Sequence, residues 1–327
     1  MGRAGQIHAG IFKDKVPEAT LMCVVDEAEN AAKDAGTRLG VNWTTDTDKA
    51  LRDDTVDAVV VAVPTYSHAS VASAALEAGK HVLVEKPLAH TPKEAERLFR
   101  EAQSSDRVFQ VGYMRRYDRA YREVKDRIAN GSLGLLLIYR AIAHDPAPPP
   151  GWAADPKLSG GIFYDMLSHD FDMGRYLMAS EVSSVYAIGS SKVCEEVAKK
   201  GDLDTVAVIM KFKSGAFGYV EGFRNSPYGY DLRTEVVGSG GSAVVGAMND
   251  PGLTFADQKG LRQYGVKWFA DRFNAAFVAE DNDFAKAIVT RGDPRVSASD
   301  GIRAVEIAEA CRLSVARKKP VSLEELD

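Results

Sequence analysis

Three side chains with acid–base chemistry stand out in two short motifs of the sequence. Lys86 follows the apolar run HVLVE and precedes a proline, while Asp165 and His169 lie in the segment DMLSH, after two adjacent glycines. A cation, a carboxylate and an imidazole can together move a proton off an alcohol while a nicotinamide takes the hydride. The two motifs therefore predict the active site of a dehydrogenase.

Each of the three side chains has an expected role in that chemistry. Lys86 would hydrogen-bond the substrate hydroxyl and favour its alkoxide character, and His169 would accept the hydroxyl proton. Asp165 would orient the substrate and stabilise the imidazolium. Since Asp165 and His169 are four residues apart, we expect them to share one face of a single helix over 162–178.

Other interpretations of the same residues stay open. Lys86 could be an ordinary surface lysine before a turn. Asp165, His169 and Asp172 could cap and solvate a helix start, or ligate one metal ion. We expect no metal, because hydride transfer to a nicotinamide needs none and no cysteine or histidine cluster supports zinc.

The chain opens with the spacing Gly-x-x-Gly, in Gly2, Arg3, Ala4 and Gly5. A dinucleotide-binding fold uses a strand, then Gly-x-Gly-x-x-Gly, then a helix whose N-terminus faces the pyrophosphate. The sequence starts inside this motif, so we expect a late start site to explain the absent first glycine and first strand. A genuinely short protein with weakened cofactor binding is the alternative explanation. The Gly-x-x-Gly spacing itself could also be a flexible N-terminus without a cofactor role.

An acidic residue after the next strand strengthens the prediction of a dinucleotide site. Asp26 lies 21 residues after Gly5, where a carboxylate accepts hydrogen bonds from the adenosine ribose. Its charge and that of Glu27 repel a 2′-phosphate, so we expect NAD rather than NADP. Asp26 could also cap a surface loop, and His68 could be a helix residue without cofactor contact. The expected cofactor-binding residues are Gly2, Arg3, Ala4, Gly5, Asp26, Pro64, Thr65, His68, Glu85 and Lys86.

Alternating strands and helices in the first third of the chain are expected to position these residues. The expected strands are 19–26, 56–63, 81–84 and 109–112, and the expected helices are 29–39, 67–78 and one that begins at Thr91-Pro92. Segment 56–63 is apolar throughout, as strands of parallel sheets are. This rhythm predicts an α/β fold with a Rossmann-type doubly wound sheet, whose first strand is missing from the chain.

The pattern changes after about residue 115. Helices are expected at 118–130, at 162–178 and from 269 onward, and strands at 135–143, 182–189, 205–213, 216–224, 232–237 and 241–245. Glycine-containing tight turns join several strands, which predicts an open, mostly antiparallel sheet. We expect a dinucleotide-binding domain over 1–115 and an α/β domain for substrate and oligomerisation over 116–327. The C-terminal helices could pack back on the first domain.

Composition limits the classes of protein. A chain of 327 residues with 45% hydrophobic residues suits two packed domains. A net charge of −5 argues against a nucleic-acid or acidic-membrane surface. The cysteines Cys23, Cys194 and Cys311 are few and far apart, as in reduced cytoplasmic proteins. No apolar run is long enough to span a membrane, so we expect a cytoplasmic protein.

The motifs resemble a known family. Glu85-Lys86-Pro87 resembles the signature, and Asp165-x-x-x-His169 the catalytic pair, of the glucose–fructose oxidoreductase and inositol dehydrogenase (Gfo/Idh/MocA) family of NAD(P)-dependent oxidoreductases. The resemblance covers the chain from Gly2 onward. Segments 111–118, 228–231 and 271–284 are similar to the inositol 2-dehydrogenase branch.

The resemblance implies a function and a substrate site. The expected activity is NAD-dependent oxidation of a secondary alcohol of a cyclic polyol, most simply myo-inositol, to the ketone. The alternatives are another inositol isomer, an aldose or a sugar derivative, or a non-catalytic sensor or subunit with a weakened cofactor loop. In that branch, residues matching Met114, Arg115 and Tyr230 line the polyol, although here they could be surface or packing residues.

Two further expectations follow. His144, at a strand end beside the proline-rich segment 145–150, is added to the candidate substrate residues on its position alone. In the family, the open sheet of the second domain commonly packs against another subunit. The resemblance therefore implies a homodimer or homotetramer.

Overall fold

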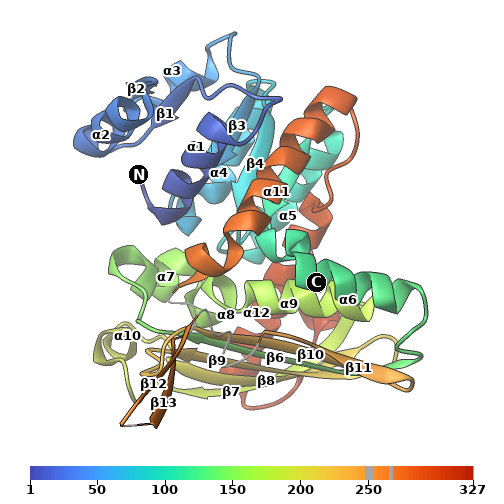
Figure 1. Cartoon of the computed structure of the whole chain (residues 1–327). Coiled ribbons are helices and arrows are strands. Elements are labelled where there is room, and N and C mark those ends of the chain that lie inside the picture. Colours follow the sequence, from blue (N-terminus) through green and yellow to red (C-terminus); the bar gives the residue numbers. More distant parts are fainter. Residues whose placement is uncertain (247–252, 259, 265–267, 327) are drawn as a thin grey trace. The chain divides into compact units, whose positions relative to one another are not determined.

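The structure is a computed structural model that describes residues 1–246, 253–258, 260–264 and 268–326. The chain forms two compact units, shown in Figure 1. The first consists of Met1–Tyr117 and Ala275–Ile302, and the second of Asp118–Asn274 and Arg303–Asp327. Within the described part of the chain, none of the helices is long and apolar enough to cross a membrane.

The first unit alternates strands and helices. Its elements are α1 (Arg3–Asp14), β1 (Cys23–Val25), α2 (Glu29–Leu39), β2 (Asn42–Thr44), α3 (Thr47–Leu51), β3 (Ala58–Val61), α4 (Thr65–Glu77), β4 (His81–Glu85), α5 (Pro92–Ser104), β5 (Phe109–Gly112) and the 3₁₀ turn η1 (Met114–Tyr117). All paired strands are parallel, in a sheet β3-β4-β5 and a separate pair β1-β2. Most of α11 (Phe269–Thr290) also belongs to this unit.

Local sequence explains several of these elements. The side chains of Val82, Leu83 and Val84 in β4 are fully buried, as expected for the middle strand of a parallel sheet. Helix α5 begins with Thr91 as its N-cap, since the Thr91 hydroxyl accepts from the Glu94 N–H at 3.3 Å and donates to the Glu94 carboxylate at 2.9 Å. The expected strand 19–26 is shorter, because only Cys23–Val25 pairs with β2.

The second unit is built on one large sheet. Its other elements are α6 (Arg119–Ala129), β6 (Leu136–Asp145), η2 (Gly151–Ala154), α7 (Pro156–Ser159), α8 (Gly161–Asp165), α9 (Ser168–Met178), β7 (Val182–Ser190), α10 (Glu195–Lys199), β8 (Thr205–Phe212), β9 (Phe217–Arg224), β10 (Asp231–Gly238), β11 (Gly241–Val245), β12 (Leu253–Asp257), β13 (Gly260–Tyr264), α12 (Ala298–Arg317), β14 (Val321–Ser322) and η3 (Leu323–Leu326). The sheet order is β11-β10-β6-β9-β8-β7-β14, and only the β6–β9 pair is parallel among its described strands. The expected α/β architecture with an open, mostly antiparallel sheet is confirmed.

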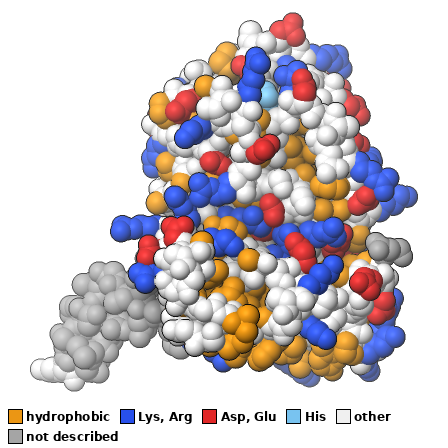
Figure 2. All heavy atoms as spheres, turned by 90° about the vertical axis from the view of Figure 1, so that its right-hand side faces the viewer, with side chains coloured by type: hydrophobic (Ala, Val, Ile, Leu, Met, Phe, Trp, Pro, Cys, Tyr) orange, Lys and Arg blue, Asp and Glu red, His pale blue; other side chains and the backbone are white. Residues whose placement is uncertain are grey.

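One face of this sheet is covered and the other is open. Helices α6, α9 and α12 lie along the covered face (Figure 1). In β8, the side chains of Val206, Val208 and Met210 point to that face and are buried, whereas Ile209 between them is 46% exposed. Figure 2 shows hydrophobic side chains gathered near the lower edge of the view. The open face carries exposed large apolar residues at Tyr186, Ile188, Ile209, Phe217 and Val244.

The prediction of a single helix over 162–178 is wrong. The structure has two short helices, α8 ending at Asp165 and α9 beginning at Ser168. Leu167 has ψ near zero and its N–H donates to Ile162 O at 3.0 Å, which closes a wider turn than the α-helix allows. Asp165 and His169 therefore lie on different helices and do not share a helix face.

Candidate functional site

The cofactor candidates of the first unit follow parallel strands. Val61 in β3 pairs with Val84 in β4, and Glu85 pairs with Gly112 in β5. Because the carboxyl ends of parallel strands meet at one edge, the segments that begin at Pro64, Lys86 and Met114 lie along the same edge of the sheet. Crevices at such edges bind ligands in open α/β sheets.

The glycine-rich opening forms the start of α1. Gly2 is extended and caps the helix, whose first turn runs from Arg3 to Gln6. Gly5 faces the residue that follows β3, because a Cβ there would lie 3.7 Å from the Ala62 Cβ. The first turn of α1 therefore offers backbone N–H groups and an arginine, a combination suited to a phosphate.

Asp26 follows β1, as expected. Its carboxylate accepts from the Ala28 N–H at 2.9 Å and forms an ion pair with the Met1 ammonium at 2.8 Å. The side chain is 26% exposed. Asp26 thus remains open to solvent on the same side as the start of the chain.

The backbone around Lys86 is held on two sides. On one side, Glu85 Oε2 accepts the Lys86 N–H at 3.0 Å. On the other, the buried ring of His68 lies 2.7 Å from Pro87 O and 2.9 Å from Val63 O through its two nitrogens. The expected cofactor residue His68 is therefore a bridge between the loops that follow β3 and β4. The Lys86–Pro87 peptide is cis.

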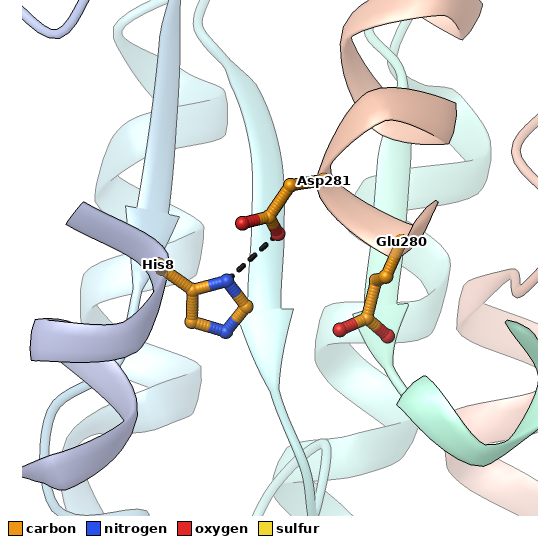
Figure 3. Close-up of side chains that lie close together, drawn as sticks. All are labelled: His8, Glu280 and Asp281. Carbon is orange, nitrogen blue, oxygen red and sulfur yellow. Dashed lines mark hydrogen bonds and ion pairs between the residues drawn. The ribbon is translucent and has the colours of Figure 1, made fainter. Parts of the chain in front are cut away.

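A buried cluster lies behind Glu85. The His8 ring, on α1, lies 2.7 Å from Asp281 Oδ1 (Figure 3). Its other nitrogen lies 3.1 Å from Glu85 Oε1. Burial would lower the pKa of His8, but the charge and hydrogen bond of Asp281, followed by those of Glu85, raise this pKa well above 6.5. Burial opposes ionisation of Glu85, but the hydrogen bond and charge of His8 lower its pKa. Burial raises the pKa of Asp281, but its contact with His8 opposes this shift, so the contacts favour an imidazolium between two carboxylates.

Glu280 extends this cluster. Its carboxylate is fully buried, and among the described residues neither oxygen has a hydrogen-bond partner. Burial raises the pKa of Glu280 well above 4.5, although the charge of His8 opposes the shift. His8, Glu280 and Asp281 have ligand atoms within 4.8 Å of one another, as a metal site would. Both nitrogens of His8 already face carboxylates, so a metal ion would have to displace the proton that this geometry favours.

Two of the expected substrate residues of the first unit follow β5. Met114 and Arg115 lie in η1 and are both buried, with 4% exposure each. Arg116 beside them forms an ion pair with Asp300 at 2.8 Å. Arg116 therefore has a structural partner inside the first unit, where the sequence allowed a surface charge.

In the second unit, Asp165 is held by a buried arginine. Arg224 of β9 is 1% exposed, and its guanidinium lies 3.3 Å from Asp165 Oδ2 and 2.6 Å from Asp202 Oδ2. Gly161 makes this arrangement possible, because its φ is +77° and a Cβ there would lie 2.6 Å from Asp202 Oδ1. Gly161 thus permits the close approach of the Asp202 carboxylate.

His169 lies in the first turn of α9 and is 8% exposed. Asp172, which the metal interpretation included, is fully buried and 3.9 Å from Arg175. The Tyr230 ring packs on Trp268, with ring centroids 6.1 Å apart. Both aromatic residues belong to the second unit.

His144 belongs to a polar cluster of its own. Its Nε2 lies 2.7 Å from Glu221 Oε1, and its Nδ1 contacts the Tyr228 hydroxyl. His144 pairs with Phe223 of β9, and Glu221 lies two residues before Phe223, so both side chains point to the same face of the sheet. Arg224, the next residue after Phe223, points to the opposite face. A role of His144 in substrate binding stays a prediction.

The sequence motifs did not identify several of these charged residues. His8 was not among the candidate site residues, although it lies three residues after Gly5 on the same helix. Asp202 and Arg224 lie outside every motif, and only the structure brings them to Asp165. Glu280 and Asp281 lie within segment 271–284, but that segment gave them no role.

Comparison with known proteins identifies the family. Residues 1–113 match the family described as "Oxidoreductase family, NAD-binding Rossmann fold", and residues 121–244 match the "GFO/IDH/MocA C-terminal domain". The chain is 36% identical to myo-inositol 2-dehydrogenase of Thermotoga maritima, over 100% of this chain and 97% of that protein. It is 35% identical to scyllo-inositol 2-dehydrogenase (NAD(+)) of Bacillus subtilis, over 99% and 94%.

A solved structure shows the same fold. Scyllo-inositol dehydrogenase from Lactobacillus casei, with bound NAD(H) and scyllo-inositol, superposes with a TM-score of 0.92 at 30% identity. The match covers 99% of this chain and 97% of that one. The chain therefore belongs to the Gfo/Idh/MocA family of oxidoreductases with an NAD-binding Rossmann fold.

Proposed function

We propose that this protein oxidises a secondary alcohol of a cyclic polyol, an inositol, to the ketone with NAD as the hydride acceptor. The relatives named above act on myo-inositol and scyllo-inositol. The observation that carries the proposal is that the chain has Lys86 after the central strand of its parallel sheet and Asp165 held by a buried arginine. Because the chain belongs to a family of oxidoreductases with an NAD-binding fold, we assign these two residues to the oxidation of the alcohol.

The proposed chemistry assigns one step to each side chain. Lys86 hydrogen-bonds the reacting hydroxyl and stabilises its alkoxide character. His169 accepts the hydroxyl proton, and Asp165 orients the substrate and balances the charge of the imidazolium. NAD supplies the carbon that accepts the hydride. Arg224 supports this scheme because it keeps the Asp165 carboxylate in one place.

The residues of the first unit fit NAD. The first turn of α1, from Gly2 through Arg3 and Ala4 to Gly5, would bind the pyrophosphate. Asp26 would accept hydrogen bonds from the ribose and repel a 2′-phosphate. Pro64 and Thr65, at the start of α4, would border the cofactor, as would Glu85 and Lys86 at the end of β4.

The substrate site remains a proposal at the level of single residues. We assign Met114, Arg115 and Tyr230 to it because they match residues that line the polyol in the inositol 2-dehydrogenase branch. We also assign His144 to the site on its position in the sequence, and its ring contacts Glu221 and Tyr228.

Initial rates of NAD reduction test the proposed function. We expect turnover with myo-inositol or scyllo-inositol and slower turnover with aldoses and acyclic polyols. Lys86→Ala should abolish most of this turnover, while Lys93→Ala, at an exposed position of α5, serves as the matched control. A chain that binds NADH but oxidises only aldoses would contradict the inositol assignment. A chain that binds no NADH at millimolar concentration would favour a non-catalytic subunit.

We also propose that the protein is a cytoplasmic homodimer or homotetramer. The cysteines Cys23, Cys194 and Cys311 are free thiols, as in reducing compartments. The open face of the large sheet carries Tyr186, Ile209 and Tyr219 in register on three neighbouring strands, and such apolar faces are usually covered by a partner. Light scattering tests this, and Ile209→Asp should dissociate the oligomer. A monomeric mass at micromolar concentration would contradict it.

A further inference from the structure

A continuous chain of hydrogen bonds leads from α11 to the backbone of Lys86. Asp281 Oδ1 lies 2.7 Å from His8 Nδ1, the link drawn in Figure 3. His8 Nε2 then lies 3.1 Å from Glu85 Oε1, and the other oxygen of Glu85 accepts the Lys86 N–H at 3.0 Å. We propose that His8 and Asp281 are positioning residues that fix Lys86 through the Glu85 carboxylate. The proposal rests on the proposed function for the role of Lys86.

Burial makes this chain of contacts stiff. Asp281 is fully buried, His8 is 1% exposed and Glu85 is 7% exposed. Water cannot replace a lost partner at these positions, so each charged group depends on its neighbour. The orientation of the Glu85 carboxylate is therefore set by His8, and the orientation of the His8 ring is set by Asp281.

Steric contact holds the Glu85 carboxylate from its other side. A Cβ placed on Gly112, in the neighbouring strand β5, would lie 3.2 Å from both Glu85 Cα and Cδ and 3.3 Å from Glu85 Oε2. The glycine thus lets the carboxylate lie against the β5 backbone. Glu85 is confined between this backbone and the His8 ring, which leaves it one orientation toward the Lys86 N–H.

The charge state of His8 follows from the same geometry. A neutral imidazole has one N–H, so it would leave one of its two carboxylate neighbours facing a lone pair. The imidazolium donates to Asp281 and Glu85 together. Glu280, the third acid of the cluster, faces the same ring and has no hydrogen-bond partner among the described residues. The His8 cation thus donates a hydrogen bond to each of the two carboxylates, those of Asp281 and Glu85.

A purely structural role is the competing explanation. His8 on α1, Glu85 on β4 and Asp281 on α11 could simply hold three elements of the first unit together. Such a role would lower stability, and its effect on turnover would not depend on whether Lys86 is present. A positioning role acts only through Lys86. The two explanations therefore differ in a double-mutant cycle.

The cycle combines His8→Gln or Asp281→Asn with Lys86→Ala, measured as NAD reduction by myo-inositol. In the parent chain, we expect each single substitution to lower kcat by about 10- to 100-fold, the scale of a catalytic group displaced by about 1 Å. In the Lys86→Ala background, we expect no further loss beyond about twofold. His90→Gln is the matched control, since it removes another histidine–carboxylate pair of the first unit, with Glu94. Equal losses in both backgrounds would overturn the proposal.

A second measurement does not need turnover. Reductive ¹³C-methylation of the lysines gives NMR signals, and the one lost in Lys86→Arg reports the Lys86 amine. We expect Asp281→Asn, which preserves shape, and His8→Gln to move that signal, while His90→Gln leaves it in place. If no polyol is oxidised but the signal moves, the proposed function fails and the positioning role stands. If the signal is unchanged in both variants, the positioning role fails.

Discussion

Replacing Glu280 by glutamine should change how the stability of the protein depends on pH. Burial raises the pKa of Glu280 well above its ordinary value of 4.5, so the folded protein keeps a proton that the unfolded chain releases above that pH. The folded state then binds more protons than the unfolded state, and the free energy of unfolding falls as pH rises. Glutamine is nearly the same shape and does not titrate.

The magnitude follows from one proton. Between 4.5 and the raised pKa of the folded state, Glu280 lowers the free energy of unfolding by about 1.4 kcal/mol for each pH unit. Glu280→Gln should therefore gain stability relative to the parent chain at this rate as the pH rises above 4.5, until the folded parent chain releases the Glu280 proton. The buried amide of the glutamine changes the free energy of unfolding by a constant amount, because its N–H donors lack partners. This change does not depend on pH, so it leaves the slope of the free energy against pH unchanged.

Urea denaturation followed by circular dichroism, at a series of pH values, measures both curves. The difference between the variant and the parent chain should grow with pH and level off where the folded state releases its proton. Glu18→Gln, at an exposed position of the same unit, controls for the loss of one surface carboxylate. Parallel curves for Glu280→Gln and the parent chain would mean that Glu280 is ionised in the folded protein, which would refute the reasoning.

Three further outcomes are expected. Asp26→Ser combined with Glu27→Arg should shift the cofactor preference from NAD toward NADP in steady-state rates, and a parent chain that prefers NADP would contradict the role of Asp26. Lys86→Ala and His169→Ala should each lower kcat by about 10²–10⁴ while NADH fluorescence still reports binding; near-normal activity in either would remove its assigned role. Arg224→Met should lower the free energy of unfolding by about 3–5 kcal/mol, because it strands buried carboxylate charge. A loss under about 1 kcal/mol, measured in urea, would show that this charge is solvated.

The sequence predicted the helices and strands that depend on patterns among residues close together in the chain. The apolar run before Lys86 predicted a buried strand, and Thr91 with Pro92 predicted the start of α5. Segment 205–213 was expected to be a strand, and it forms β8, in which buried and more exposed residues alternate. Periodicity and capping depend on neighbours in the chain, so a single sequence contains them.

Contacts between distant residues could not be predicted in this way. Asp165 meets Arg224, 59 residues later, and His8 meets Asp281, 273 residues later. The break between α8 and α9 was also missed, because the apolar residues continue through it. It depends on the backbone at Leu167 rather than on a proline or glycine.

The bridge made by His68 has a consequence for the mobility of the sheet edge. Its two nitrogens face Pro87 O and Val63 O, but burial lowers the pKa of His68 and so favours the neutral ring. Neutral imidazole has one N–H and can donate to only one carbonyl at a time. The two loops thus compete for a single proton, and the tautomer of His68 decides which of them is tethered. Tautomer exchange would loosen one loop as it fastens the other.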